Sequence, residues 1–183
     1  MKKISIFGDS ISTDPILKAL VEKKLSDRSI DAKVDIFAVP GESSKDGLKR
    51  LYQVVQGAYD YNIVFFGAND AALHYNVSPS EFVENLQRIA STLGQDKTSI
   101  ITVPYLNEKL TSKYRSNEQV AKYVEAEINA FKDSPVNIIN LNKAMWETRN
   151  PDKFIIDDGL HFTEAGYQLL SDLITENIRK KVE

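Results

Sequence analysis

Residues 61–70 read YNIVFFGAND, and this stretch decides the fold class. Its centre, Ile63–Phe66, is apolar at every position, which favours a strand that is covered on both faces in a parallel sheet. The apolar run gives way at Gly67 to small and polar residues. Ligand sites of open parallel sheets lie beyond the carboxyl ends of the strands. The residues that follow Phe66 are therefore candidates for a functional site.

The same alternation extends through the rest of the chain. Four further short runs, rich in apolar and β-branched residues, predict strands at Lys3–Phe7, Val34–Val39, Ser99–Val103 and Val136–Leu141. Stretches with apolar residues at helical spacing predict helices at Pro15–Leu25, Lys45–Val55, Ser80–Leu93, Asn117–Phe131 and Glu164–Arg179. Strands that alternate with helices predict an α/β fold, a three-layer α/β/α sandwich with a five-stranded parallel sheet. We expect residues 1–183 to form a single domain, because the length suits one domain and no linker interrupts the pattern.

Two of the predicted helices have residues suited to cap their first turns. Thr163 stands before the last helix, and Ser43 and Ser44 stand before the second. The side-chain oxygen of Ser or Thr accepts a hydrogen bond from a free backbone N–H of the first turn. We therefore expect all three residues to act as helix caps.

Composition excludes several classes of protein. The 23 basic and 26 acidic residues give a net charge of −3, which argues against a nucleic-acid partner. The chain has no Cys and only two His, so disulfides, thiolate nucleophiles and His-rich metal sites are excluded. The apolar stretch after Lys2 and Lys3 stops at Gly8, which is too short for a signal peptide, and no run is long enough to span a membrane. These observations predict a cytoplasmic protein.

Small and polar residues gather at four places in the sequence. Three follow predicted strands, GDSIS at 8–12, PGESS at 40–44 and GAND at 67–70. The fourth, DDGLH at 157–161, comes directly before the last helix. Because parallel strands end at one edge of the sheet, we expect these segments to converge there.

The converging residues are those that acyl transfer needs. A hydroxyl nucleophile must lose its proton to a nearby base, most often a His that a carboxylate orients. Ser10 directly follows a strand, His161 is the one His in the cluster, and Asp158 lies three residues before it. Gly41 allows a backbone N–H to approach a substrate oxygen closely, and Asn69 supplies an amide donor. The set predicts a serine nucleophile with donors for an oxyanion.

Each of these residues also has a purely structural interpretation. Ser10 could cap the helix that follows the first strand, and Gly41 could serve only as a turn glycine. Asn69 could end a loop or cap a helix. Asp158 could be a turn residue, with Asp157 as the partner of the base. The presence of all four segments in one chain favours the catalytic interpretation.

Two other polar residues near the segments receive structural interpretations. Asp9 stands beside Ser10 and is expected to be a buried turn-forming residue rather than a catalytic acid, with a secondary orienting role as the alternative. His74 is expected to lie in a surface loop on the approach to the site. The walls of a substrate pocket are expected, by position alone, at 71–75 and 104–107.

These residues resemble the sequence blocks of the GDSL or SGNH hydrolases, and in particular the small bacterial lipase/acylhydrolase and esterase members. The first block corresponds to Phe7–Ser10, the second to Pro40–Ser44, the third to Gly67–Asp70 and the fifth to Asp158–Thr163. The resemblance covers residues 3 to about 175. In this family the first block often ends in Thr, whereas Ile11 and Ser12 stand here.

The resemblance implies roles for five residues. Ser10 would be the nucleophile, His161 the base and Asp158 the residue that orients it. The backbone N–H groups of Ser10 and Gly41, with the Asn69 side chain, would form the oxyanion hole. The implied fold is a flavodoxin-like sandwich, and no metal or organic cofactor is implied.

The resemblance defines the reaction better than the substrate. It implies a serine esterase or acylhydrolase that cleaves a small-molecule carboxylic ester through an acyl-enzyme on Ser10. The short crossover of residues 13–33 favours short acyl or acetyl groups. One alternative is a lysophospholipase or acyl-CoA thioesterase with the same triad. The alternative from another class is a flavodoxin-like binding module without catalysis.

Overall fold

The computed structural model describes residues 1–182, and its centre is a five-stranded sheet in which every pair of neighbours is parallel. The strand order is β2-β1-β3-β4-β5, which is the flavodoxin-like order. The strands are β1 (Lys2–Gly8), β2 (Ala32–Ala38), β3 (Tyr61–Phe65), β4 (Thr98–Ile101) and β5 (Asn137–Ile139). All five lie where the sequence predicts strands, with ends shifted by up to two residues.

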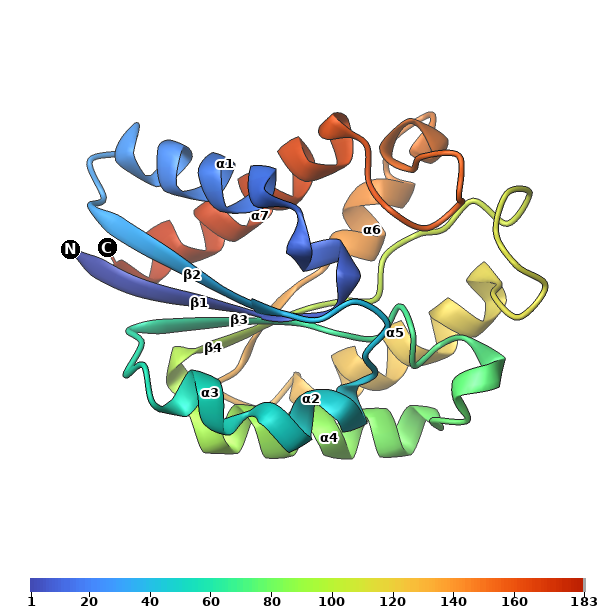
Figure 1. Ribbon diagram of the computed structural model, residues 1–183, viewed down its shortest axis with the longest axis horizontal. Coiled ribbons are helices and arrows are strands. Elements are labelled where there is room, and N and C mark those ends of the chain that lie inside the picture. Colours follow the sequence, from blue (N-terminus) through green and yellow to red (C-terminus); the bar gives the residue numbers. More distant parts are fainter. Residues whose placement is uncertain (183) are drawn as a thin grey trace.

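Helices cover both faces of the sheet (Figure 1). One face carries α1 (Pro15–Ser26), α6 (Leu141–Trp146) and α7 (Glu164–Val182). The other carries α2 (Ser44–Arg50), α3 (Tyr52–Val55), α4 (Pro79–Leu93) and α5 (Asn117–Phe131). Four short 3₁₀ helices complete the set: η1 (Ser10–Thr13), η2 (Leu73–Tyr75), η3 (Gln95–Lys97) and η4 (Pro151–Phe154). The predicted three-layer α/β/α sandwich is confirmed.

The apolar strands supply a core on each side of the sheet. Successive side chains of a strand point to opposite faces, so Ile63 and Phe65 pack toward α1 and α7 while Val64 and Phe66 pack toward α4 and α5. All four are at most 1% exposed. Burial on both faces is the reason that this run contains no polar position.

One helical prediction is wrong in detail, and one short helix is absent from the predictions. The helix predicted at Lys45–Val55 is divided into α2 and α3, because the Leu51 N–H bonds to Leu48 O in a tighter turn. The short helix α6 was not predicted, and its first residue, Leu141, belonged to the predicted fifth strand. The strand stops earlier because the Asn140 side chain accepts the N–H of Lys143 and caps α6.

Two of the three predicted helix caps are confirmed. Thr163 Oγ1 accepts the N–H of Gly166 at 3.3 Å at the start of α7. Ser43 and Asp46 form a reciprocal capping box on α2. The Ser44 prediction is wrong, since its backbone N–H and hydroxyl both bond to the buried carboxylate of Asp70 instead.

Both ends of the described chain lie at the amino edge of the sheet (Figure 1). The hydroxyl of Tyr61, at the start of β3, donates to Lys181 O near the end of α7 at 3.4 Å. The residues that follow the strands lie at the opposite edge. Among residues 1–182, no helix is long and apolar enough to cross a membrane.

A carboxylic acid is buried between α5 and the sheet. The Glu127 side chain is 0% exposed, and its Oε2 accepts the N–H of Val103 at 3.2 Å. Its Oε1 has no hydrogen-bond partner among the described residues. Burial raises the pKa of Glu127 well above its ordinary value; the Val103 bond opposes this rise and the nearby charge of Asp70 adds to it. The fold therefore favours the neutral acid.

We expect Glu127→Gln to stabilise the protein increasingly as pH rises. The pKa of Glu127 is higher in the folded protein than its value of 4.5 in the unfolded chain, so wild type loses stability as the pH rises above 4.5. The neutral Gln side chain does not titrate, so the variant lacks this loss. The free energy of unfolding of the variant should exceed that of wild type by an amount that grows by up to about 1.4 kcal/mol per pH unit between the unfolded and folded pKa values of Glu127. Urea unfolding from pH 4.5 to 8 measures this difference.

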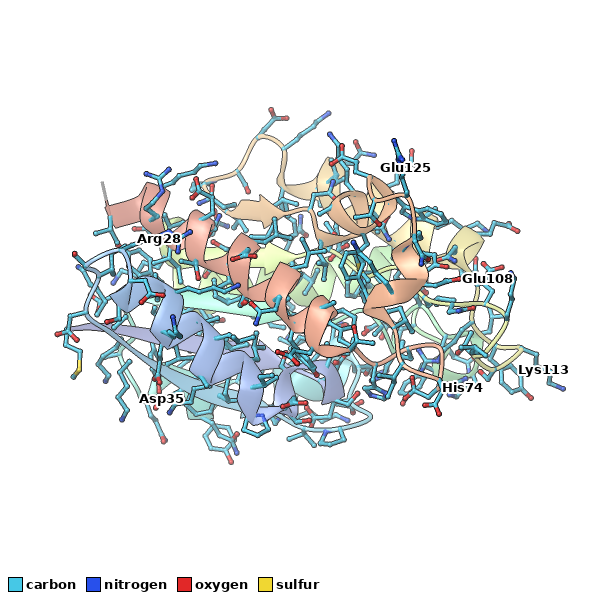
Figure 2. The ribbon with its side chains drawn as sticks, turned by 90° about the horizontal axis from the view of Figure 1, so that it is seen from above. Arg28, Asp35, His74, Glu108, Lys113 and Glu125 are labelled. Carbon is cyan, nitrogen blue, oxygen red and sulfur yellow. The ribbon has the colours of Figure 1, made fainter. Side chains whose placement is uncertain are left out.

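The matched control is Glu125→Gln, two residues away on the exposed side of α5 (Figure 2). This substitution should leave the pH dependence of wild type unchanged. Parallel stability curves for wild type and Glu127→Gln would contradict the assignment of a neutral, buried acid.

Candidate active site

The turn after β1 presents Ser10 at the carboxyl edge of the sheet. Gly8 ends the strand, where an added Cβ would collide with Phe65 O and with Ser12 Oγ at 2.8 Å. Asp9 follows and is 1% exposed, and its Oδ1 accepts the Ile11 N–H at 3.1 Å. Burial raises the pKa of Asp9 to about 7, although the Ile11 hydrogen bond opposes the shift. The prediction that Asp9 is a buried turn-forming residue is confirmed.

Ser10, His161 and Asp158 form one hydrogen-bonded chain. The Nε2 of His161 lies 2.8 Å from Ser10 Oγ, and its Nδ1 lies 2.5 Å from Asp158 Oδ2. With Nδ1 donating to the carboxylate, Nε2 is left as the acceptor that faces the serine hydroxyl. Asp158, rather than Asp157, is thus the partner of His161. The geometry is that of a nucleophile, a base and the residue that orients the base.

Asp158 is held ionised by its own loop. Its Oδ1 accepts the backbone N–H groups of Leu160 and His161 at 2.8 and 2.9 Å. Partial burial raises the pKa of Asp158, but these bonds and the His161 side chain together lower it below its usual value. A charged carboxylate in this position stabilises the protonated form of the histidine to which it is hydrogen-bonded.

The loop that carries Asp158 and His161 is fixed at both ends. Ile155 and Phe162 form an antiparallel bridge, and the Ile156 N–H donates to His161 O at 2.9 Å. Gly159 has φ +77°, and a Cβ there would lie 2.5 Å from the Thr111 nitrogen. Its carbonyl accepts the N–H of Asn107 at 2.9 Å. The segment after β4 therefore packs directly against this loop.

Gly41 lies in a turn after β2, with φ +79°. Its carbonyl accepts the Tyr75 hydroxyl at 2.8 Å. The next residue, Glu42, forms an ion pair with the buried Arg50 at 2.5 Å. The same guanidinium donates to Gly8 O at 2.9 Å. Arg50 thus ties the Gly41 turn to the end of β1, two residues before Ser10.

Asn69 follows β3 and is 4% exposed. Its Nδ2 donates to Glu42 O at 2.9 Å, and its Oδ1 accepts from Arg115 at 3.0 Å. Next to it, Asp70 accepts the Ser44 hydroxyl at 2.5 Å. Burial raises the pKa of Asp70 to about 6, while its bonds to Ser44 oppose the shift. The Asn69 turn is consequently joined to the Gly41 turn by one partly buried contact and to the start of α2 by a buried one.

The structure thus brings the five predicted site residues to one edge of the sheet. Three of them, Ser10, Asp158 and His161, are joined directly by hydrogen bonds. The Asn69 side chain donates to the carbonyl of Glu42, the residue that follows Gly41. No group of three or more potential metal ligands from His, Cys, Asp and Glu occurs among residues 1–182.

Loops around this edge differ in exposure. Residues 104–107, named above as a candidate wall, are buried, with Tyr105 7% and Leu106 3% exposed. Of residues 71–75, only Leu73 and His74 are exposed, and both lie in η2. The His74 ring lies 4.7 Å from that of Tyr75 and 5.2 Å from that of Tyr114. Figure 2 shows His74 and Lys113 at the same end of the molecule. His74 is a surface residue, as predicted.

Two residues beside the site, Arg50 and Arg115, have no counterpart in the sequence prediction, and Tyr75 was expected there only as part of a candidate pocket wall at 71–75. Arg50 and Arg115 hold the Gly41 and Asn69 turns, and Tyr75 bonds to Gly41 O. Arg115 lies in the long segment between β4 and α5, where no motif marks it. Arginine is rarely buried without a partner, so the partial burial of Arg115 would point to a specific role. That burial cannot be recognised from the sequence, because it depends on the fold.

Comparison with known proteins gives a consistent result. Residues 6–169 match the model of the GDSL-like Lipase/Acylhydrolase family. The chain is 29% identical to the isoamyl acetate-hydrolyzing esterase of Saccharomyces cerevisiae, over 93% of this chain and 83% of that protein. It is 25% identical to a GDSL esterase/lipase of Arabidopsis thaliana, over 97% of this chain and 86% of that protein. Among solved structures, the lipase/acylhydrolase from Enterococcus faecalis superposes with a TM-score of 0.95 at 33% identity, covering 99% of this chain and 97% of that one.

Asp158 and Asp157 provide a test of the hydrogen-bonded chain. We expect Asp158→Asn to slow the reaction of Ser10 with a fluorophosphonate probe by about 10²- to 10⁴-fold, because the amide no longer supports the required His161 tautomer. Asp157→Asn, an exposed neighbour, should react like wild type. Labelling rates followed by intact-mass spectrometry measure both. Equal loss in the two variants would refute the specific pairing.

Proposed function

The chain belongs to the GDSL-like lipase/acylhydrolase family and is a hydrolase of ester bonds, and we propose that it is a serine esterase that cleaves short-chain carboxylic esters through an acyl-enzyme on Ser10. The observation that carries the proposal is the chain of contacts from Ser10 Oγ through His161 to Asp158, at 2.8 and 2.5 Å. A non-catalytic binding module has no use for this chain of contacts. The relatives named above are esterases and lipases, and they do not favour such a module either.

Acylation begins at the Ser10 hydroxyl. His161 Nε2 takes the hydroxyl proton as Ser10 Oγ attacks the ester carbonyl, and ionised Asp158 stabilises the imidazolium that forms. The carbonyl oxygen becomes an oxyanion, which accepts hydrogen bonds from the backbone N–H groups of Ser10 and Gly41 and from the Asn69 amide. Collapse of this intermediate breaks the ester C–O bond, and His161 returns the proton to the departing alcohol.

Deacylation repeats these steps with water. His161 removes a proton from water, the hydroxide attacks the acyl-enzyme carbonyl, and the same donors hold the second oxyanion. Collapse releases the carboxylic acid and returns the proton to Ser10 Oγ. The chain's own residues supply each proton acceptor and donor in both halves of the cycle.

Two observations support a small acyl group. Both the Saccharomyces cerevisiae relative and one from Schizosaccharomyces pombe are isoamyl acetate-hydrolyzing esterases, and the latter is 26% identical over 81% of this chain. The triad also faces solvent, with the side chains of His161 and Asp158 35% and 43% exposed. A short acyl group needs no deep pocket beside such a site.

A longer acyl group is the second candidate, as in a lysophospholipase or a thioesterase. Leu73 and Tyr114 are 54% and 43% exposed. The Leu73 N–H donates to Tyr114 O at 2.9 Å, next to the residue that contacts Asn69. These apolar side chains offer a surface along which an aliphatic chain could lie.

Hydrolysis of p-nitrophenyl esters from acetate to palmitate distinguishes the two candidates. We expect wild type to have its highest kcat/KM on acetate or butyrate. Ser10→Ala should lower kcat by several orders of magnitude, on the order of 10⁶ for a triad nucleophile. Ser91→Ala, a substitution of an exposed serine on α4, is the matched control and should keep wild-type activity.

Other outcomes have defined meanings. A maximum at long chains would replace the short-chain proposal by the lysophospholipase or thioesterase candidate. Full activity of Ser10→Ala would overturn the assignment of the nucleophile and with it the acyl-enzyme mechanism.

A further inference from the structure

We propose that Arg115 is a positioning residue that acts through Asn69, fixing its amide so that an N–H group rather than the amide oxygen faces the substrate carbonyl. This inference rests on the proposed function, in which Asn69 donates to the oxyanion. Arg115 lies outside the four sequence blocks on which the family resemblance rests. It is therefore a separate requirement on the site.

The two contacts of the Asn69 amide determine its orientation. A guanidinium has only donors, so the atom of Asn69 that faces Arg115 at 3.0 Å must be the oxygen. A backbone carbonyl only accepts, so the atom that faces Glu42 O at 2.9 Å must be the nitrogen. A flipped amide would set donors against donors on one side and acceptors against acceptors on the other. Among residues 1–182, Nδ2 donates to Glu42 O alone, so its second N–H is available to a ligand.

Arg115 fixes the backbone as well as the side chain. A second nitrogen of its guanidinium donates to Ala68 O, the carbonyl directly before Asn69. Contacts to both Ala68 and Asn69 use the fork of donors that a guanidinium offers and that a lysine lacks. The positive guanidinium next to the amide oxygen polarises the amide and thereby strengthens its remaining N–H as a donor.

Charged neighbours favour the ionised form of Arg115. Partial burial lowers the pKa of Arg115, whereas Tyr75, Asp9 and Asp158 raise it. A guanidinium remains protonated in proteins despite such burial. The positive charge of Arg115 therefore interacts with the carboxylate of Asp158.

The segment that carries Arg115 also contacts the other half of the site. Tyr114 O accepts the N–H of Leu73 at 2.9 Å, while Asn107, at the start of the same segment, donates to Gly159 O at 2.9 Å. One segment thus contacts both the loop of the base and the turn of the amide donor. Arg115 is placed by a part of the chain that is itself anchored twice.

A double-mutant cycle tests whether Arg115 acts through Asn69. On p-nitrophenyl acetate we expect Asn69→Ala to lower kcat by about 10²- to 10³-fold, the loss typical of one oxyanion donor. Arg115→Met should lower kcat by about 10- to 100-fold with KM changed less than about 2-fold. In the Asn69→Ala background, Arg115→Met should cost less than about 2-fold, because the residue through which it acts is gone.

Arg88→Met is the matched control, since Arg88 is exposed on α4, and it should match wild type. Arg115→Lys keeps a charge but not the fork, so its kcat should fall between wild type and Arg115→Met. If Arg115→Met does not fold, as judged by its thermal melt, the cycle is completed with Arg115→Lys.

Three results would overturn the proposal. Losses that multiply in the double variant would show that Arg115 acts independently of Asn69. A change confined to KM would assign Arg115 to substrate binding, and unchanged kcat in Arg115→Met would leave it no role. A Ser10→Ala variant with full activity would instead refute the proposed function, so the two failures are distinguishable.

Discussion

The parallel pairing of β1 with both β2 and β3 sets the position of the three turns that carry Ser10, Gly41 and Asn69. Gly8, the last residue of β1, pairs with Ala38 on one side and with Phe65 on the other. Three turns consequently start from the same level of the sheet, and they carry Ser10, Gly41 and Asn69. The core residues on the two faces of β3 hold this register, because a shift by one residue would exchange its two buried faces.

The turns need more than a common starting point, since catalysis depends on donors held within a narrow range of positions. Buried polar contacts supply that restraint. Arg50 connects the Gly41 turn to β1, Glu42 O receives the Asn69 amide, and Asp70 bonds to the first turn of α2. The low dielectric around these groups strengthens each bond and makes a missing partner costly. The hydrogen bonds beneath the site therefore restrain the positions of its turns.

The sequence was sufficient for the fold class and for the candidate residues because both depend on local patterns. A uniformly apolar run marked β3, a short run rich in isoleucine marked β1, and short polar segments marked the turns that follow them. The sequence could not indicate Arg115 or the short helix α6. Arg115 gains its meaning from contacts with Ala68 and Asn69, some 46 residues away in the chain, and α6 depends on one side-chain cap at Asn140. Long-range contacts of a single side chain leave no periodic trace in the sequence.

The separation between the chain ends and the site has a practical consequence. The described ends of the chain lie together at the amino edge of the sheet, and the polar turns lie at the carboxyl edge (Figure 1). Attachment through either end to a bead, an electrode or a fusion partner would orient the carboxyl edge toward the medium. The fold thus suits immobilised formats in which the support does not compete with substrate for the same face.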